Sequence, residues 1–176
     1  MPVTEFATLR IKEPHTIQLE TLRQHLHSLG EAQAAWSGYP LTFYSDYKDV
    51  SLIHLVTGWK DVEAHMKWIV GEENQKFREI FEQFLSVDGL AHIDIDFAQI
   101  PSDARALTCK KSVVSVEGSQ TEQVATGSER LWAGQGEDLE KQKAFYQFEA
   151  YNDGILQHAT NTEGTELKIM TRLSLP

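Results

Sequence analysis

The 176-residue sequence has one cysteine and few basic residues, and each shortage excludes a class of protein. A lone Cys109 forms neither an intrachain disulfide nor a cysteine-based zinc site. It is also typical of a reducing compartment, so we expect a cytoplasmic protein. Lysines and arginines number 16 against 26 aspartates and glutamates, for a net charge of −10. Because such a surface repels phosphates, we expect no nucleic-acid partner.

Long apolar runs are also absent. No stretch approaches the roughly 20 apolar residues that span a bilayer, so no membrane association is expected. The opening residues, Met-Pro-Val-Thr-Glu-Phe, lack the basic and then apolar order of an export signal. The chain is 41% hydrophobic and 24% charged, which is ordinary for a globular protein of one or two domains.

The first part of the chain predicts an α+β fold. Apolar spacing predicts a strand over 3–11, a helix from Thr16 to Trp36, a hairpin of strands over 41–45 and 51–58, helical segments over 60–69 and 72–85, and a strand over 90–97. This β-α-β-β-α-β order is ferredoxin-like, a four-stranded antiparallel sheet with helices on one face.

The rest of the chain predicts a weaker second unit. Strands are expected over 107–116, 144–151 and 167–173, a short helix over 155–159, and a polar loop over 117–136. An aromatic residue, an aspartate and a helix with a histidine occur in the same order at Trp59–His65 and at Tyr151–His158. We therefore predict a ferredoxin-like domain over 1–101 and a degenerate second repeat over 102–176 that completes or extends a barrel.

Four segments carry a resemblance to a known family. They are residues 2–6 (PVTEF), 36–40 (WSGYP), 58–65 (GWKDVEAH) and 90–96 (LAHIDID). Together they resemble the dimeric α/β-barrel superfamily, and within it the fungal proteins with antibiotic-biosynthesis-monooxygenase (ABM) domains. The resemblance implies two ferredoxin-like sheets packed face to face, with a ligand between them. The second sheet would come from residues 102–176 or from a second copy of the chain, and a homodimer is expected.

The candidate catalytic residues are His92, Asp94 and His54. His92 and Asp94 share one face of the 90–97 strand, opposite Ala91 and Ile93. If the apolar face packs under the helices, His92 points into the space between the sheets, where Asp94 would fix its tautomer and make it a general base. His54 joins it there only if the alternate residues of its strand also point inward, and is otherwise a buried core histidine.

The candidate substrate-binding residues are Tyr44, Trp59, Arg10, Phe6 and Trp68. Four are aromatic and suit either the walls of a pocket for a planar ligand or the packed core. Arg10 could stabilise an enolate or superoxide, or form a surface salt bridge. His65 borders an apolar helix stripe and is interpreted as a packing residue. His92 and Asp96 lie too far apart along one strand to share an ion without a ligand from another strand, so no metal site is predicted. That no cofactor is needed is what the resemblance implies.

These observations support two hypotheses from different classes. The first is a small cofactor-free enzyme of secondary metabolism, a monooxygenase or a cyclase/isomerase acting on a planar phenolic or polyketide-like compound. His92 would remove a proton while Tyr44 or Arg10 stabilises the resulting oxyanion. The second is a non-catalytic module of the same fold that binds a small molecule or assists assembly. Haem handling, which requires an axial histidine in the pocket, is a third possibility.

Overall fold

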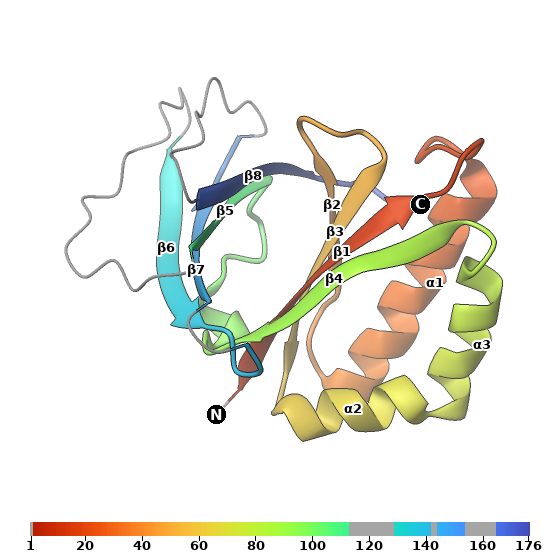
Figure 1. Ribbon diagram of the computed structural model, residues 1–176, viewed down its shortest axis with the longest axis horizontal. Helices are drawn as coiled ribbons and strands as arrows, with labels where there is room; N and C mark the ends of the chain where they lie inside the picture. Colours follow the sequence, from red (N-terminus) through yellow and green to blue (C-terminus); the bar gives the residue numbers. More distant parts are fainter. Residues whose placement is uncertain (1, 113–128, 142–143, 154–164) are drawn as a thin grey trace.

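The computed structural model describes residues 2–112, 129–141, 144–153 and 165–176. Eight strands form one curled antiparallel sheet in the order β4-β1-β3-β2-β8-β5-β7-β6, and the helices gather on one side of it (Figure 1). The elements are β1 (Val3–Ile11), α1 (Glu20–Ser37), β2 (Thr42–Asp46), β3 (Leu52–Trp59), α2 (Val62–Val70), α3 (Glu72–Phe81), β4 (Leu85–Ile93), the 3-10 helix η1 (Phe97–Gln99), β5 (Ala106–Ser112), β6 (Arg130–Glu137), β7 (Phe145–Tyr151) and β8 (Thr165–Arg172).

The ferredoxin-like order predicted for the first part is confirmed, with several shifted boundaries. Helix α1 begins at Glu20 rather than Thr16, and α3 ends at Phe81. Strand β4 begins at Leu85, five residues before the predicted start, and ends at Ile93 rather than at residue 97. The prediction failed because a bulge breaks the alternation: β1 pairs Thr8 with Gly89 but Leu9 with Val87. The bulge places Leu85 and Leu90 against the same helix-side core although their numbers differ in parity.

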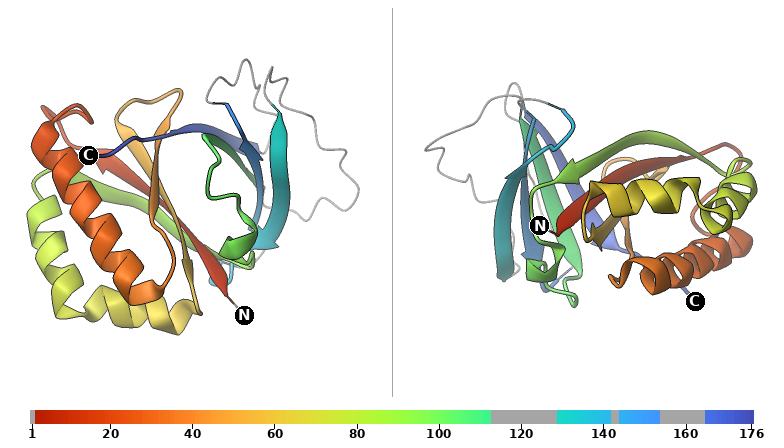
Figure 2. Two further views of the ribbon diagram at one scale, coloured as in Figure 1. Left: turned by 180° about the vertical axis from the view of Figure 1, so that it is seen from behind. Right: turned by 90° about the horizontal axis from the view of Figure 1, so that it is seen from below.

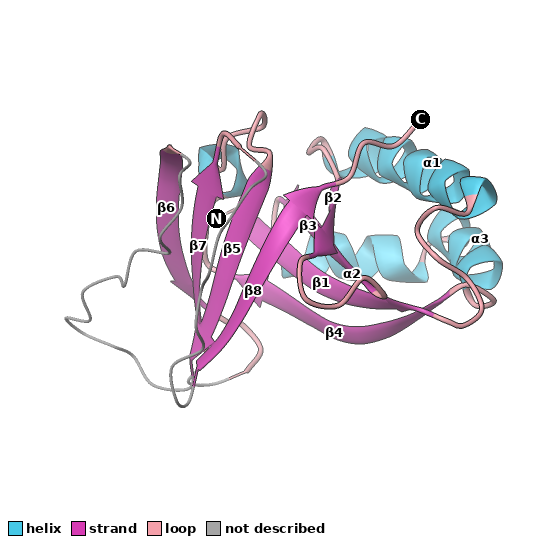
Figure 3. Ribbon diagram, turned by 90° about the horizontal axis from the view of Figure 1, so that it is seen from above, coloured by secondary structure: helices cyan, strands magenta, loops and turns pink. Residues whose placement is uncertain are grey.

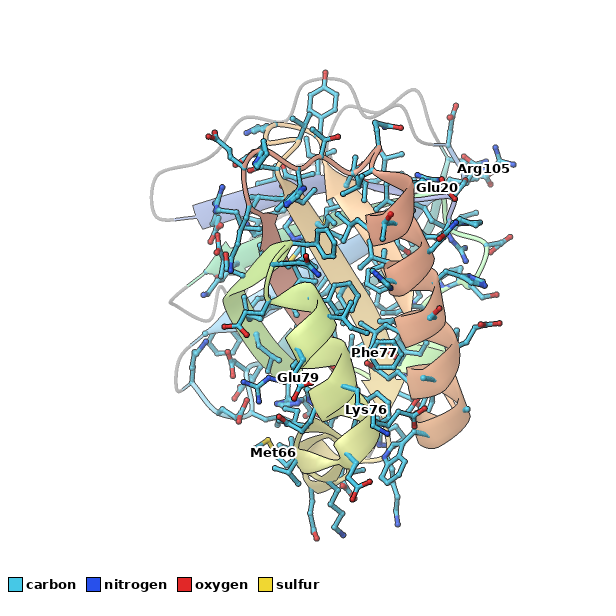
Figure 4. The ribbon with its side chains drawn as sticks, turned by 90° about the vertical axis from the view of Figure 1, so that its right-hand side faces the viewer. Glu20, Met66, Lys76, Phe77, Glu79 and Arg105 are labelled. Atoms are coloured by element: carbon cyan, nitrogen blue, oxygen red, sulfur yellow. The ribbon has the colours of Figure 1, made fainter. Side chains whose placement is uncertain are left out.

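The helical layer covers one face of β1, β3 and β4. Helix α1 contributes a buried stripe of leucines and ends at Gly38, whose φ of 79° favours glycine. Figure 4 looks onto this layer and shows Phe77 of α3 lying between α3 and α1. None of the helices among the described residues has the length and apolar character needed to cross a bilayer.

The opposite face of these strands is covered by the second half of the same chain. Strand β2 pairs with β8, which joins the two halves into one sheet. The sheet then curls (Figures 2 and 3). Its interior is filled from both sides, for example by Phe6 and Val56 against Phe148 and Met170. The structure therefore surrounds the barrel interior with strands of a single chain, an arrangement that the sequence had left open.

The two ends of the sheet meet near the end of β4. Ile93 forms a bridge with Asp138, the Leu139 amide donates to the His92 carbonyl at 2.8 Å, and the Asp94 amide donates to the Glu137 carbonyl at 3.0 Å. A β-carbon on Gly136 would lie 2.6 Å from the Asp94 carbonyl oxygen, so this approach requires glycine.

The prediction of a polar loop over 117–136 is wrong for residues 130–136, because Arg130–Glu137 forms the edge strand β6. Its alternation was hidden since two of its inward positions, 134 and 136, are glycines without side chains. The short helix predicted over 155–159 lies outside the described residues. The degenerate repeat and the division at residue 101 stay predictions.

Candidate active site

A buried carboxylate on β1 lies at the centre of the candidate site. Glu5 occupies the strand face that also carries Val3 and Ala7, beneath the helices, and is 3% exposed. It is paired in register with His92 of β4, so the two side chains extend from the same face of the sheet. Carboxylates are rarely buried unless they are paired or functional, so Glu5 is a candidate functional residue.

Helix α2 supplies the histidine that lies against Glu5. The Asp61 side chain caps the helix by accepting from the Ala64 amide, and His65 follows on the next turn. His65 Nε2 lies 3.4 Å from Glu5 Oε2. The Trp59 ring stacks on the His65 ring at a centroid distance of 4.5 Å, and Trp59 Nε1 donates to Glu5 Oε2 at 2.6 Å. One ring contact and one hydrogen bond from Trp59 therefore fix the pair.

The chain of contacts continues from His65 to the protein surface. His65 Nδ1 and His92 Nε2 are 2.6 Å apart, and His92 Nδ1 lies 2.7 Å from Glu140 Oε2. His65 and His92 are buried, whereas the Glu140 side chain is 47% exposed. Four titratable groups from β1, α2, β4 and the turn after β6 thus form one continuous line from the core to solvent.

Burial controls the protonation of the inner pair. It raises the pKa of Glu5 from 4.5 to about 7, although the Trp59 hydrogen bond acts in the opposite direction. Burial, together with a smaller repulsion from His92, lowers the pKa of His65 from 6.5 to about 3. Near neutral pH the His65 ring is therefore neutral while Glu5 exchanges its proton.

Glu5 and His65 line a cavity of about 640 Å³ between the sheet and the three helices. This volume lies in the range of small-molecule sites, roughly 300 to 1,000 Å³. Most of its wall is apolar or aromatic, including Leu29, Leu55, Trp68, Ile69, Phe77 and Phe81. Arg78, Glu79 and Glu82 of α3 and the segment just beyond it also line it, and they are exposed.

The Gln33 side chain on α1 also lines this cavity, and its amide nitrogen has an unused hydrogen-bonding capacity. Gln33 is 3% exposed, and its Nε2 atom has no hydrogen-bond partner within the described part of the chain. A buried donor without a partner costs about 1 to 3 kcal/mol. Such a group is accounted for if a ligand oxygen accepts its hydrogen bond, so the cavity contains a donor as well as an acid–base pair.

The expected orientation of His92 is wrong. Ala91 and Ile93 turn into the barrel interior, so His92 turns toward the helices and is fully buried there. The strand was correctly divided into two faces, but the assignment of these faces was reversed because the second half of the chain supplies its own apolar strands to cover the first. Asp94 follows the end of β4 and is exposed, and the partners of His92 are His65 and Glu140.

The other predicted residues are divided by the sheet. Trp59 and Trp68 lie on the helix side with His92, and Trp68 lines the cavity there. His54, Tyr44, Phe6 and Arg10 lie on the barrel side. The structure therefore does not bring the eight predicted residues into one pocket.

On the barrel side, His54 is buried, with Nε2 at 3.0 Å from Asp46 Oδ2 and Nδ1 at 3.1 Å from the Thr8 hydroxyl. Phe6 and Arg10 line a cavity of about 350 Å³ inside the barrel. Arg10 is already paired there with Asp88 at 2.7 Å and Asp49 at 3.2 Å.

Tyr44 is also buried on this side, where burial raises its pKa to about 12. It lines a void of about 40 Å³, which is too small for a drug-sized ligand.

Sequence reasoning missed four residues of the site. Glu5 was detectable, since it interrupts the apolar parity Val3, Ala7, Leu9 and Ile11 of one strand. His65 was interpreted as packing, yet it contacts both Glu5 and His92. Gln33 and Glu140 carry no local signal, because their roles arise from elements that are distant in sequence. Among the described residues, no three histidine, cysteine, aspartate or glutamate side chains are grouped as a metal site requires.

Comparisons with known proteins identify the fold alone. No family model and no curated protein matches the chain. Among solved structures, a candidate monooxygenase from Fusobacterium nucleatum subsp. nucleatum is similar with a TM-score of 0.66 and 14% identity, covering 99% of this chain and 93% of that one. A candidate chlorite dismutase is similar with a TM-score of 0.63 and 10% identity, covering 98% of this chain and 95% of that one. An anthrone oxidase-like protein is similar with a TM-score of 0.54 and 13% identity, covering 98% of this chain and 92% of that one. The chain thus has the α+β fold of these ferredoxin-like proteins.

Proposed function

We propose that the protein is a small monooxygenase-like enzyme that removes a proton from a planar phenol or enol bound between the sheet and the helices. The observation that carries this proposal is the buried Glu5–His65 pair at the wall of the 640 Å³ cavity. The fold it shares with candidate monooxygenases and an anthrone oxidase-like protein adds support by analogy. The narrower resemblance to fungal ABM proteins, a role in secondary metabolism and a homodimer remain part of the proposal.

Glu5 is the group suited to act as the base. A general base works best when its pKa lies near the operating pH, and burial raises the pKa of Glu5 to about 7. The neutral His65 ring beside it receives the proton through its Nε2 atom. This assigns to Glu5 and His65 the role that the sequence suggested for His92 and Asp94.

Gln33 supplies the group that stabilises the oxygen of the substrate. As the proton leaves, negative charge develops on the phenolate or enolate oxygen, and the unpartnered Nε2 of Gln33 donates to it. Trp68 and Phe77 form flat apolar walls beside this amide. The cavity is thus complementary to a ring compound with one polar edge rather than to a charged metabolite.

The deprotonated substrate then has the electrons for the oxidation itself. For an anthrone-like CH₂ group, one atom of O₂ becomes the new carbonyl oxygen, and the other leaves as water with the two hydrogens of the CH₂. The substrate is oxidised and O₂ is reduced, and no further reductant is required. A substrate without such a carbon would instead cyclise or rearrange after the same proton removal.

A direct test uses 1,8-dihydroxyanthrone as the probe, with O₂ uptake and anthraquinone absorbance as the two signals. We expect turnover by the wild type above the spontaneous rate, and a loss of about 100-fold or more in Glu5→Gln. Gln33→Leu should weaken binding of the probe as well as turnover. Tyr146→Phe, which alters the cavity inside the barrel, is the matched control and should leave turnover unchanged.

Two results would reject catalysis in this cavity. If the probe and phenolic analogues bind in the cavity without any turnover, the alternative of a binding module is favoured. If Tyr146→Phe abolishes turnover and Glu5→Gln does not, the reaction takes place on the barrel side of the sheet.

A further inference from the structure

We propose that His92 and Glu140 form a proton path that connects the Glu5–His65 pair in the cavity with solvent. This inference rests on the proposed function of the cavity, but its geometry is independent of the substrate. The contacts are 3.4 Å from Glu5 to His65, 2.6 Å from His65 to His92 and 2.7 Å from His92 to Glu140. His92 does not line the cavity, so its position is not explained by substrate binding.

The hydrogen-bond directions along this path follow from the exposed end. The carboxylate of Glu140 accepts, so His92 Nδ1 carries the hydrogen and donates it. His92 Nε2 is then an acceptor, and His65 Nδ1 must donate to it. This leaves His65 Nε2 without a hydrogen and directed toward Glu5, which is the tautomer required to receive a proton from that side.

A proton taken up by Glu5 can therefore move outward in three transfers. Glu5 gives it to His65 Nε2, His65 releases its Nδ1 proton to His92 Nε2, and His92 releases its Nδ1 proton to Glu140. Each ring gains one proton and loses one, so both remain neutral and both change tautomer. Glu140 then releases the proton to water. When a proton later enters by the reverse sequence and leaves with the product water, both rings return to their original tautomers.

The outer end of the path is built by the closure of the barrel. Asp138 Oδ1 accepts from the amides of Glu140 and Lys141, which fixes the turn. The Leu139 amide bonds to the carbonyl of His92 itself, so the turn is attached to the residue it serves. The second half of the chain thus contributes the outer group of a path that begins in a cavity lined by residues of the first half.

Within the described part of the chain, no other charged group near the path makes a contact with Glu5 that would offer an equivalent exit. Arg78, Glu79 and Glu82 line the cavity from the α3 side, and all three are exposed. Lys141, next to Glu140, donates to the Leu90 carbonyl. The contacts described for the buried Glu5 carboxyl are with Trp59, which donates to it, and with His65. The imidazoles therefore provide its connection to the surface.

A pH-jump experiment tests the path without any substrate. Trp59 donates to Glu5 and stacks on His65, so its fluorescence reports loss of the proton from Glu5. Subtracting the fluorescence of the Trp59→Phe variant from that of the wild type removes the contribution of the other tryptophans. After a stopped-flow jump from pH 6 to pH 8, we expect the wild-type signal to change within the mixing time. In His92→Ala and Glu140→Gln the same change should slow by about tenfold or more.

Two controls separate proton transfer from structural damage. Lys141→Met alters the neighbouring residue of the same turn and should react as fast as the wild type. In His92→Ala, 4-methylimidazole should restore the fast phase by occupying the vacated space, which a merely structural loss would not allow. The path is overturned if His92→Ala and Glu140→Gln both react as fast as the wild type, or if 4-methylimidazole does not restore the fast phase in His92→Ala. Absence of turnover with every substrate would instead contradict the proposed function while leaving this result intact.

Discussion

His65 Nδ1 lies 2.6 Å from His92 Nε2, although one ring belongs to a helix and the other to the strand beneath it. One nitrogen must donate and the other accept, so the contact requires that at least one of the facing nitrogens carries no proton. With its pKa lowered to about 3, His65 is the ring that stays neutral across the physiological range. The bond therefore joins the helical layer to the closing edge of the barrel and sets the tautomers of both rings.

The first prediction concerns Glu5→Gln and the pH dependence of stability. The pKa of Glu5 is raised from 4.5 to about 7, so between these values the unfolded chain ionises while the folded protein holds its proton. Stability from this group is full below pH 4.5 and is lost as the pH rises to about 7. The free energy of unfolding of Glu5→Gln should not fall over this pH range, so it should gain roughly 3 kcal/mol relative to the wild type by pH 7. Urea unfolding across this pH range measures it.

Glu140→Gln is the matched control for that comparison. Its carboxyl is 47% exposed, so its stability difference from the wild type should stay within about 1 kcal/mol over the same range. A stability difference between Glu5→Gln and wild type that does not change from pH 4.5 to 7 would show that Glu5 titrates normally.

The second prediction concerns Trp59→Phe. Its indole N–H donates to Glu5 and thereby favours the ionised carboxylate. Without that donor the pKa of Glu5 should rise above about 7, and stability should fall by about 1 to 3 kcal/mol from the lost buried hydrogen bond. A carbon-13 NMR titration of the Glu5 carboxyl checks the direction. A lower pKa in this variant would mean that the indole does not contact the carboxylate.

The third prediction concerns Gln33→Leu. The Nε2 atom of Gln33 is buried without a partner, so replacing the amide by an apolar side chain of similar size should raise stability by about 1 to 3 kcal/mol. The same change should weaken binding of 1,8-dihydroxyanthrone, because it removes the donor for the ligand oxygen. Thermal unfolding and fluorescence titration measure the two effects. A variant that is less stable and binds normally would place the amide in a structural role.

The fourth prediction concerns the acid range and His65. Its pKa is lowered from 6.5 to about 3, so stability from the neutral ring is full above pH 6.5 and is lost as the pH falls toward 3. Nitrogen-15 NMR should show an uncharged His65 ring at pH 5, with the hydrogen on Nδ1. In His65→Asn this contribution to acid sensitivity should be absent. A charged ring at pH 5 would contradict the assigned burial and hydrogen bonding.

The strands of the first half could be predicted because local alternation determines them. The faces of β1 were separable from Ala7, Leu9 and Ile11, and the faces of β4 from Ala91 and Ile93. Alternation cannot reveal which face meets the helices, since that depends on what covers the other one. Here Phe148 and Met170 from the second half cover it, and this reversed the expected orientation of His92.

The site itself was less accessible to sequence reasoning. Glu5 is visible as a charged residue at an apolar position, so its parity was a usable signal. Glu140 reaches His92 only because Gly136 and Asp138 close the sheet, a contact across 48 positions. Gln33 is distinguished by the lack of a partner in three dimensions, which no periodicity expresses.

The most direct measurement is to map where a planar ligand binds, by two-dimensional NMR of the wild type titrated with 1,8-dihydroxyanthraquinone. The account predicts that the shifted signals cluster at Glu5, Gln33, His65 and Trp68, on the helix side of the sheet. Shifts confined to Phe6, Arg10 and Tyr146, inside the barrel, would contradict it.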